Sequence, residues 1–253
     1  MPGSNSWAAA ARSFGRAEVV TTPTRKAADF LEHYTKLRGV IAISCGVDAH
    51  HYTPSFTPRT ENLILFVGRI TNEKQLDKLI RAFAQLDPAL EAKLELVGGG
   101  EQENSLKALA TQLGVRDRVT FTGYAEEDYL RHALTRATVF AMPSIAELQS
   151  IATMEAMASG LPVVAANAMA LPHLVHDGEN GFLFEPGNIE EFAAKLTTVL
   201  TMPEDELQKL KRESLTIVAA HDIQRTITTF EAIYRGEPIP EIQIDIPEVK
   251  PAP

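Results

Sequence analysis

The sequence contains very little cysteine: the only thiol among its 253 residues belongs to Cys45. A single thiol excludes an intramolecular disulfide framework and is typical of a reducing compartment. Runs of about 18 apolar residues, the length that spans a bilayer, are also missing. The first segment, MPGSNSWAAAARSFGRAE, lacks the long apolar core of a signal peptide. We therefore expect a cytoplasmic protein.

Clusters of basic residues are absent as well. The formal net charge is −9 and the sequence pI is near 5.3. Nucleic acids and anionic membrane surfaces attract basic patches, so neither is an expected partner. With 45% hydrophobic and 23% charged residues, the composition is that of an ordinary soluble globular protein. We expect a small-molecule ligand held by local positive charge.

Two common nucleotide motifs are missing. The run from Gly98 to Gly100 begins a G-x-G-x-x-G pattern, but Glu103 occupies the place of the third glycine. No G-x-x-x-x-G-K-[ST] segment occurs anywhere. Binding of nicotinamide dinucleotides and P-loop nucleotide chemistry are therefore disfavoured. Gly98 itself has two interpretations, since glycine allows close backbone approach to a ligand but also forms ordinary tight turns.

What the chain does contain is a regular alternation of short apolar runs and amphipathic helical runs. Several strand candidates are continuously apolar, which is typical of parallel strands covered on both faces. The alternation predicts an α/β fold with a doubly wound, Rossmann-like parallel sheet. The predicted strands cover residues 17–22, 39–44, 62–68, 93–98, 118–123, 138–143, 161–166 and 181–186, and the predicted helices lie between them.

The alternation stops in two places. Residues 46–62 contain prolines and several hydroxyl residues and read as a linker. After residue 200 the pattern becomes wholly helical up to residue 236, and residues 237–253 form an acidic, proline-rich tail in which IQIDI is a candidate edge strand. The domain that we predict between these regions covers residues 63–200.

Ligands of doubly wound sheets bind outside the carboxyl ends of the strands. Arg69 follows the predicted strand 62–68, and Lys74 begins the helix after it. Two cations near a helix N-terminus suit a diphosphate. The alternative is a solvated surface pair, which contributes little to binding or stability.

The next informative loop follows the predicted strand 138–143. Glu147 lies in this loop, and Ser150 is suited to cap a helix over 150–159 that is apolar on most sides. Glu155 stands in the second turn of that helix, where a buried carboxylate needs hydrogen-bond partners. The two hydroxyls of a ribose would provide them. The alternatives are a glutamate that caps neighbouring backbone for Glu155 and a solvated loop residue for Glu147.

These motifs resemble the donor-binding half of retaining glycosyltransferases of family four, which have the GT-B fold. The resemblance rests on VGRITNEKQLDKLIRAF, VTFTGYAEEDYL, FAMPSIAELQSIATMEAMASGLPVVAA and LVHDGENGFLFEPGNIEEFAAKL, and it runs from about residue 40 to residue 200. Its most specific part is the E-x7-E element from Glu147 to Glu155. Leu148 and Gln149 follow the first glutamate, where the family usually has glycine or phenylalanine.

The resemblance implies a role for each site residue. Arg69 and Lys74 would bind the diphosphate, Glu155 the ribose and Glu147 the donor sugar, while Gly123 and Tyr124 would bracket the base. Arg69, Lys74 and Glu147 are the catalytic candidates, acting through electrostatic stabilisation of the leaving diphosphate. The full set implied for nucleotide-sugar binding is Gly68, Arg69, Lys74, Gly98, Gly123, Tyr124, Glu147, Gln149, Ser150, Ile151 and Glu155.

By this resemblance the chain transfers a hexosyl group from a UDP- or GDP-sugar to the hydroxyl of a sugar, polyol or lipid, without a metal or other cofactor. Residues 1–45 correspond to the end of an acceptor domain that is otherwise missing. The full-length enzyme is then cytoplasmic or peripheral at a membrane, and the uncovered surface favours self-association. Two alternatives stay open: a truncated nucleotide-sugar-binding module without transferase activity of its own, and an epimerase or phosphorylase of the same architecture.

Overall fold

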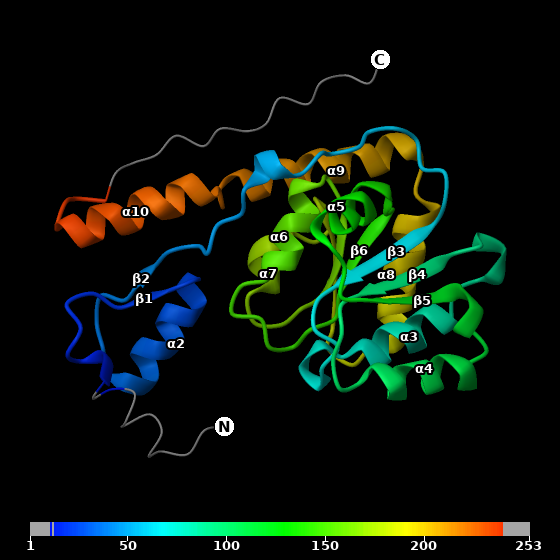
Figure 1. The fold of residues 1–253 in the computed structure, drawn as a ribbon, viewed down its shortest axis with the longest axis horizontal. Coiled ribbons are helices and arrows are strands. Elements are labelled where there is room, and N and C mark those ends of the chain that lie inside the picture. Colours follow the sequence, from blue (N-terminus) through cyan, green and yellow to red (C-terminus); the bar gives the residue numbers. More distant parts are fainter. Residues whose placement is uncertain (1–10, 12, 240–253) are drawn as a thin grey trace.

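The computed structural model describes residue 11 and residues 13–239. It contains a six-stranded sheet with strand order β5-β4-β3-β6-β7-β8 and a separate pair of strands (Figure 1). All neighbouring strands run parallel. The strands of the large sheet are β3 (Leu63–Val67), β4 (Lys93–Val97), β5 (Val119–Gly123), β6 (Val139–Met142), β7 (Val163–Ala166) and β8 (Gly181–Phe184). This order is that of the Rossmann fold, so the predicted doubly wound sheet is confirmed.

The central strands are buried on both faces, as their apolar runs predict. Leu63 is 2% exposed and Ile64 to Phe66 are fully buried, and the same holds for Val163 to Ala166. Helices cover both sides of these strands and exclude water from them (Figure 1). Apolar side chains on both faces of a strand are stable only in such a three-layer arrangement.

Helices follow the strands in the predicted alternation. Helix α3 packs against α4 and α8, while α6 packs against α9. The helices therefore form two groups, one with α3, α4 and α8 and one with α6 and α9. Right-handed crossovers explain these groups, because the chain winds outward from β3 in one direction and outward from β6 in the other. The helices are α3 (Leu76–Ala84), α4 (Glu103–Gln112), α5 (Glu127–Arg136), α6 (Ile151–Ala158), α7 (Leu171–Leu174), α8 (Ile189–Thr201), α9 (Glu204–Ala219) and α10 (Ile223–Arg235). The single turn α7 is absent from the predicted set.

A smaller unit precedes the large sheet. Strands β1 (Thr21–Thr22) and β2 (Ile41–Ala42) pair around helix α2 (Arg25–Thr35), and residues 21–42 are called the N-terminal unit below. The predicted strands 17–22 and 39–44 were therefore too long. Residues 17–19 are exposed, and a strand whose flank has neither a pairing partner nor a covering layer gains little from extended pairing.

The predicted linker is mostly irregular, with one 3-10 turn at Ala49–His51. It is fixed at its start, since the Val47 amide donates to the His221 carbonyl at 2.9 Å. The division of the chain into domains stays a prediction. Most of the predicted tail, including IQIDI, lies outside the described residues.

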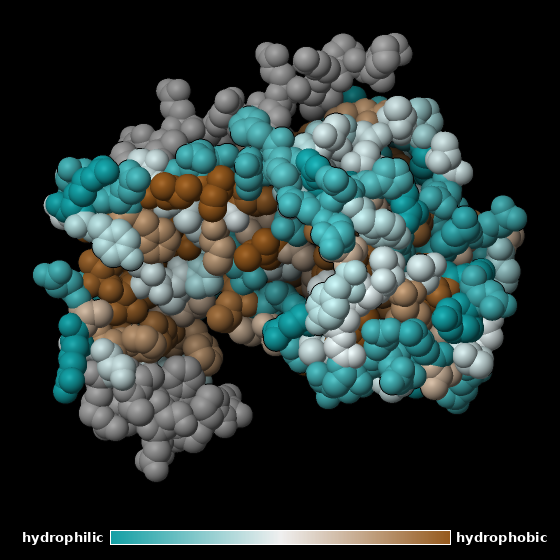
Figure 2. Space-filling model, viewed as in Figure 1, coloured by the Kyte–Doolittle hydropathy of each residue, from teal (hydrophilic) through white to brown (hydrophobic). Residues whose placement is uncertain are grey.

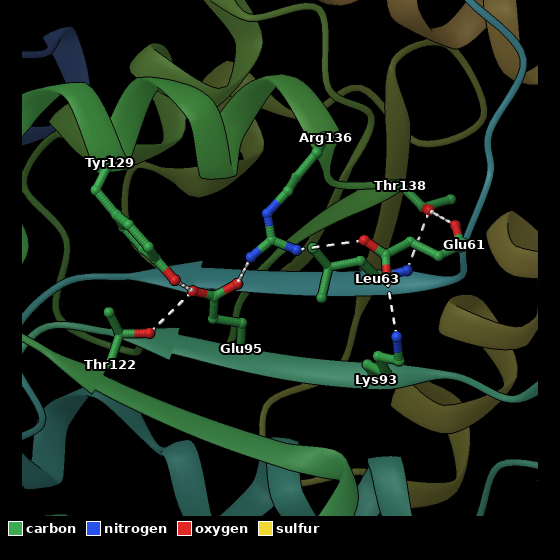
Figure 3. A network of polar contacts seen from close by, with 8 residues as sticks. All are labelled: Glu61, Leu63, Lys93, Glu95, Thr122, Tyr129, Arg136 and Thr138. Atoms are coloured by element: carbon green, nitrogen blue, oxygen red, sulfur yellow. Dashed lines mark hydrogen bonds and ion pairs between the residues drawn. The ribbon is translucent and has the colours of Figure 1, made fainter.

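A buried polar network ties the sheet to α5 (Figure 3). Glu95 on β4 is 2% exposed. Its carboxylate pairs with Arg136 and accepts hydrogen bonds from Thr122 at 2.9 Å and Tyr129 at 2.6 Å. Arg136 also contacts Glu61 at 3.3 Å. These groups satisfy a charge that would otherwise be costly to bury, so the network has a structural role.

Apolar side chains are exposed on α10 and around the N-terminal unit. Figure 2 shows hydrophobic surface gathered mainly where these elements lie. Ile227 is 43% exposed and Tyr234 is 86% exposed, so α10 presents apolar surface to solvent. Self-association through it stays a prediction. Among the described helices, none has the length and apolar character needed to cross a bilayer.

Candidate functional site

The site lies where the winding of the sheet reverses. Strands β3 and β6 are neighbours, and the chain leaves them in opposite directions. Such a switch point opens a crevice at the carboxyl ends of the strands, where ligands of this fold class bind. Lys74 comes from the segment after β3 and Glu147 from the segment after β6. Their side chains meet there, with Nζ and Oε1 2.5 Å apart.

The pair is held by its surroundings. The side chains of Lys74 and Glu147 are 15% and 9% exposed. The amide of Ile145 donates to the Glu73 carbonyl at 3.1 Å, and the amide of Ala170 donates to the Glu147 carbonyl at 3.1 Å. The two loops are thus bonded to each other and to the loop after β7. This preorganisation places one cation and one carboxylate at fixed positions in the crevice.

Arg69 behaves differently from Lys74. Its side chain is 74% exposed, and its guanidinium lies 3.7 Å from a Glu73 carboxylate oxygen. The pKa of Glu73 is lowered, first by a hydrogen bond from the Thr71 hydroxyl and further by Arg69 and Lys74. The structure therefore places the predicted diphosphate pair in one segment, but each cation faces a carboxylate. An incoming diphosphate would compete with Glu73 and Glu147.

Three predicted glycines lie together at the ends of β3, β4 and β5. The amide of Gly98 donates to the Gly123 carbonyl at 2.8 Å. A Cβ at Gly98 would lie 2.0 Å from the Gly68 carbonyl oxygen, and its φ is +130°. Only glycine fits such a contact. The structure supports the tight-packing interpretation of Gly98, and ligand contact by these glycines stays a prediction.

Tyr124 extends from the end of β5 over the neighbouring glycine loop. Its side chain is 87% exposed, and a Cβ at Gly99 would lie 2.8 Å from its ring. An exposed aromatic ring beside a glycine backbone offers a flat apolar face. Stacking of a base on this face stays a prediction.

Helix α6 begins as predicted. The Ser150 hydroxyl caps it by accepting a hydrogen bond from the Thr153 amide at 3.4 Å. Ile151 at the first helical position is 49% exposed. Glu147 precedes the helix and Glu155 lies in its second turn, which confirms the predicted placement of the two glutamates.

Gln149 has a partner that the sequence did not predict. Its amide oxygen accepts from the Cys45 amide at 2.6 Å, and its amide nitrogen donates to the Ser44 hydroxyl at 2.9 Å. Both partners lie directly before the linker, 104 and 105 residues away in sequence. Gln149 therefore fastens the Glu147 loop to the segment between β2 and the linker. A direct contact of Gln149 with a ligand stays a prediction.

Glu155 is half-buried rather than fully buried, and it meets the linker. Burial raises the pKa of its carboxyl, and a hydrogen bond with Tyr52 opposes that rise. Burial and the Glu155 charge together raise the pKa of the Tyr52 hydroxyl. The His51 ring forms a hydrogen bond with the Glu127 carboxylate of α5, and His51 is the neighbour of Tyr52 in the linker. Tyr52 therefore supplies one of the hydrogen-bond partners that we predict for the Glu155 carboxylate.

Tyr52, His51 and Glu127 were not among the predicted site residues. The sequence signal for His51 and Tyr52 is their position within GVDAHHYTP, between two regions of regular alternation. Glu127 has no such signal, since it lies in an ordinary amphipathic helical run. Among the described residues, no group of three His, Cys, Asp or Glu side chains is arranged to hold a metal ion.

A buried histidine, His221, also contacts Ser44, the residue that Gln149 of the Glu147 loop reaches. The Ser44 hydroxyl oxygen accepts hydrogen bonds from Gln149 and, at 3.1 Å, from the Gly46 amide. Its own proton is then left to donate to Nδ1 of His221, 3.0 Å away. This assignment requires the neutral imidazole with its proton on Nε2. Burial, His173 and Arg225 lower the pKa of His221 to about 4.

The stability of the fold should therefore depend on pH through His221. The pKa of His221 is about 4 in the folded protein, below its unfolded value of 6.5. The neutral imidazole therefore contributes its full stabilisation at pH values above 6.5, and this stabilisation is lost as pH falls towards about 4. We expect a loss of about 3 kcal/mol between these values, since one unit of pKa corresponds to about 1.4 kcal/mol. Urea unfolding across this pH range measures it. In His221→Asn the slope over this range should be smaller, and an unchanged slope would show that other groups cause it.

Together these features define a Rossmann-like α/β protein with a mostly buried Lys–Glu pair at the switch point of its sheet. Residues 53–214 match the family model described as glycosyl transferases group 1. The match covers more than half of the chain, which therefore belongs to this family.

Two curated relatives illustrate the family. The chain is 36% identical over 169 residues to sulfoquinovosyl transferase SQD2 of Arabidopsis thaliana, covering 61% of this chain and 32% of that protein. It is 31% identical over 220 residues to a D-inositol 3-phosphate glycosyltransferase of Rhodococcus opacus, covering 77% of this chain and 49% of that protein. The chain thus spans half or less of the length of these relatives.

The fold matches a solved structure over a larger share of the chain. HepE of Anabaena in complex with UDP-glucose superposes with a TM-score of 0.82 at 23% identity, covering 92% of this chain and 68% of that one. At this identity the similarity concerns the fold, and it identifies the fold as that of GT-B glycosyltransferases.

Proposed function

We propose that the chain is the donor-binding part of a retaining family-four glycosyltransferase that transfers a hexosyl group from a nucleoside diphosphate sugar to an acceptor hydroxyl. The main supporting observation is the Lys74–Glu147 pair, 2.5 Å apart at the switch point. A fixed cation next to a carboxylate suits a ligand that carries phosphate and sugar hydroxyls at adjacent positions.

Each side chain then has a distinct task. Lys74 and Arg69 stabilise negative charge that develops on the leaving diphosphate, without a metal ion. Glu147 accepts hydrogen bonds from the donor sugar, and the first amides of α6 face the phosphate. Glu155 binds the ribose diol with the carboxylate oxygen that Tyr52 leaves available.

The solved relatives support a uridine nucleotide as the donor. HepE of Anabaena has been solved with UDP and with UDP-glucose, and the pneumococcal O-GlcNAc transferase GtfA with UDP and GlcNAc. We propose UDP-sugars as the first donors to test, with GDP-sugars next.

A second candidate is a nucleotide-sugar-binding unit that requires further protein for transfer. The supporting observation is that the described part of the N-terminal unit has two short strands and one helix, and that only this helix, through Ala27 and Phe30, lines the hollow beside Glu147 from that unit's elements. Transfer needs the acceptor held in contact with the donor, an effect worth roughly 7–11 kcal/mol. An assay of sugar transfer on monodisperse protein separates the two candidates.

The proposed function predicts metal-independent binding of a nucleoside diphosphate. Titration calorimetry with UDP, GDP and ADP in EDTA should give saturable binding for one of them. Glu155→Gln should weaken that binding, because an amide has one acceptor oxygen where the carboxylate has two. Folding should be kept or improved, since burial raises the pKa of this carboxyl and its charge therefore disfavours the fold at neutral pH.

Two controls make this test decisive. The 2′-deoxy form of the bound nucleotide should lose less affinity on Glu155→Gln than the ribose form, because one of the two diol contacts is already gone. Loss of stability with unchanged affinity would instead assign Glu155 a structural role. Binding of none of the three nucleotides would reject the proposed function.

A further inference from the structure

A small apolar hollow adjoins Glu147 on the side that faces α2. Its volume is about 140 Å³. Its apolar wall comes from both sides of the crevice: α2 contributes Ala27 and Phe30, and the loops after β6 and β7 contribute Leu148, Met169 and Ala170. Leu148 is 56% exposed and Met169 is 40% exposed, so apolar side chains also form the rim.

The polar side chains around the hollow already have partners. The Thr24 hydroxyl lies 3.4 Å from the Leu148 carbonyl and accepts from the Ala27 amide. Nζ of Lys26 donates to the Met169 carbonyl at 3.0 Å, and Glu147 is paired with Lys74. A hydroxyl-rich ligand entering the hollow would lose hydrogen bonds to water without replacement, which is costly. The hollow therefore favours an apolar occupant.

The backbone at Met169 supports the same conclusion. Met169 has φ +49°, in the left-handed region that a non-glycine residue adopts at a cost of about 1 kcal/mol or more. A glycine would fit this backbone without strain, but it would remove part of the apolar wall. Met169 thus contributes an apolar side chain to the hollow although its left-handed backbone conformation is unfavourable in free energy.

The volume limits the size of the occupant. A protein cavity of about 150 Å³ lined by apolar side chains takes up a benzene molecule. The hollow beside Glu147 has room for one aromatic ring or a short alkyl stretch. It also adjoins the switch point, because Glu147 lines the hollow and pairs with Lys74 there.

We propose that the acceptor carries an aryl or alkyl group beside its reacting hydroxyl and that this group binds in the hollow. The inference rests on the proposed function, since it places the acceptor next to the carboxylate assigned to the donor sugar. Leu148 and Met169 are then specificity-determining residues that select acceptors with an apolar group over fully hydroxylated ones.

The test uses 4-fluorobenzyl alcohol as the probe, titrated into the whole chain and followed by fluorine NMR with and without UDP. The probe should bind saturably, and glycerol should not displace it. Ala27→Leu fills the hollow and should weaken probe binding about tenfold, the effect of losing burial of one ring. Ala108→Leu adds the same volume at an exposed position of α4 and should leave binding unchanged.

A second pair of variants separates the wall from the backbone strain. Met169→Gly relieves the left-handed conformation, so folding should be kept, but it removes part of the wall and should weaken the probe severalfold. Lys36→Gly relieves a similar conformation, with φ +61° at the exposed end of α2, and should leave probe binding unchanged.

Three results would overturn the proposal. The first is the absence of saturable probe binding. The second is equal probe affinity in the native chain and in Ala27→Leu. The third is a concentration-dependent dimer in analytical ultracentrifugation that Ala27→Leu abolishes, because the hollow would then be a contact between two copies of the chain. Calorimetry with UDP on the same samples distinguishes these results from failure of the proposed function, because Ala27→Leu should bind UDP as the native chain does.

Discussion

Replacing Lys74 with methionine is expected to abolish most nucleotide binding and to destabilise the fold. The change removes the cation from the switch point, which should weaken nucleoside diphosphate binding by roughly 1.5–3 kcal/mol, the loss of a charge-assisted hydrogen bond. It also leaves the Glu147 carboxylate, on a side chain that is 9% exposed, without its partner. Removing one member of a buried ion pair costs about 3–5 kcal/mol of stability. Calorimetry and urea unfolding measure the two effects separately.

The double variant Lys74→Met with Glu147→Gln is the matched control. Neutralising the carboxylate should restore much of the stability, because no unpaired charge remains buried. It should not restore nucleotide affinity, because the cation is still absent. Recovery of both properties in the double variant would show that Lys74 acts on the fold alone and would remove it from the binding site.

Replacing Arg136 with methionine is expected to be the most destabilising change outside the crevice. Glu95 would keep its hydrogen bonds from Thr122 and Tyr129 but lose the guanidinium that neutralises it (Figure 3). The Glu95 side chain is 3% exposed, so we expect a loss of about 3 kcal/mol or more in the free energy of unfolding. Thermal and urea unfolding provide the measurement.

A second replacement tests the cause of this loss. Glu95→Gln in the Arg136→Met background removes the buried charge while keeping an acceptor for Tyr129, and it should recover part of the stability. Nucleotide affinity should be close to that of the native chain in both variants, because this network lies away from Lys74 and Glu147. If the double variant is as unstable as the single one, packing of the Arg136 side chain rather than charge explains the effect.

Local features of the fold were predictable from sequence because they depend on neighbours within a few residues. Ser150 caps α6 through an amide three residues away, and Gly160 ends the helix segment with φ +74°. Burial of the apolar strands required only that they be covered on both faces. The two-residue lengths of β1 and β2 were not predictable, since strand length there depends on which segments supply a pairing partner.

The sequence alone determined the order of strands and helices, the parallel sheet and the placement of Glu147 and Glu155 around the start of α6. Only the tertiary structure decided which partners these residues meet. The pairing of Lys74 with Glu147 joins positions 73 residues apart, and the contact of Gln149 with Ser44 joins positions 105 residues apart. Periodicity and capping act over a few residues, whereas these contacts depend on β3 and β6 becoming neighbours. The hollow beside Glu147 has the same origin, because one wall belongs to α2 and the other to loops more than a hundred residues later.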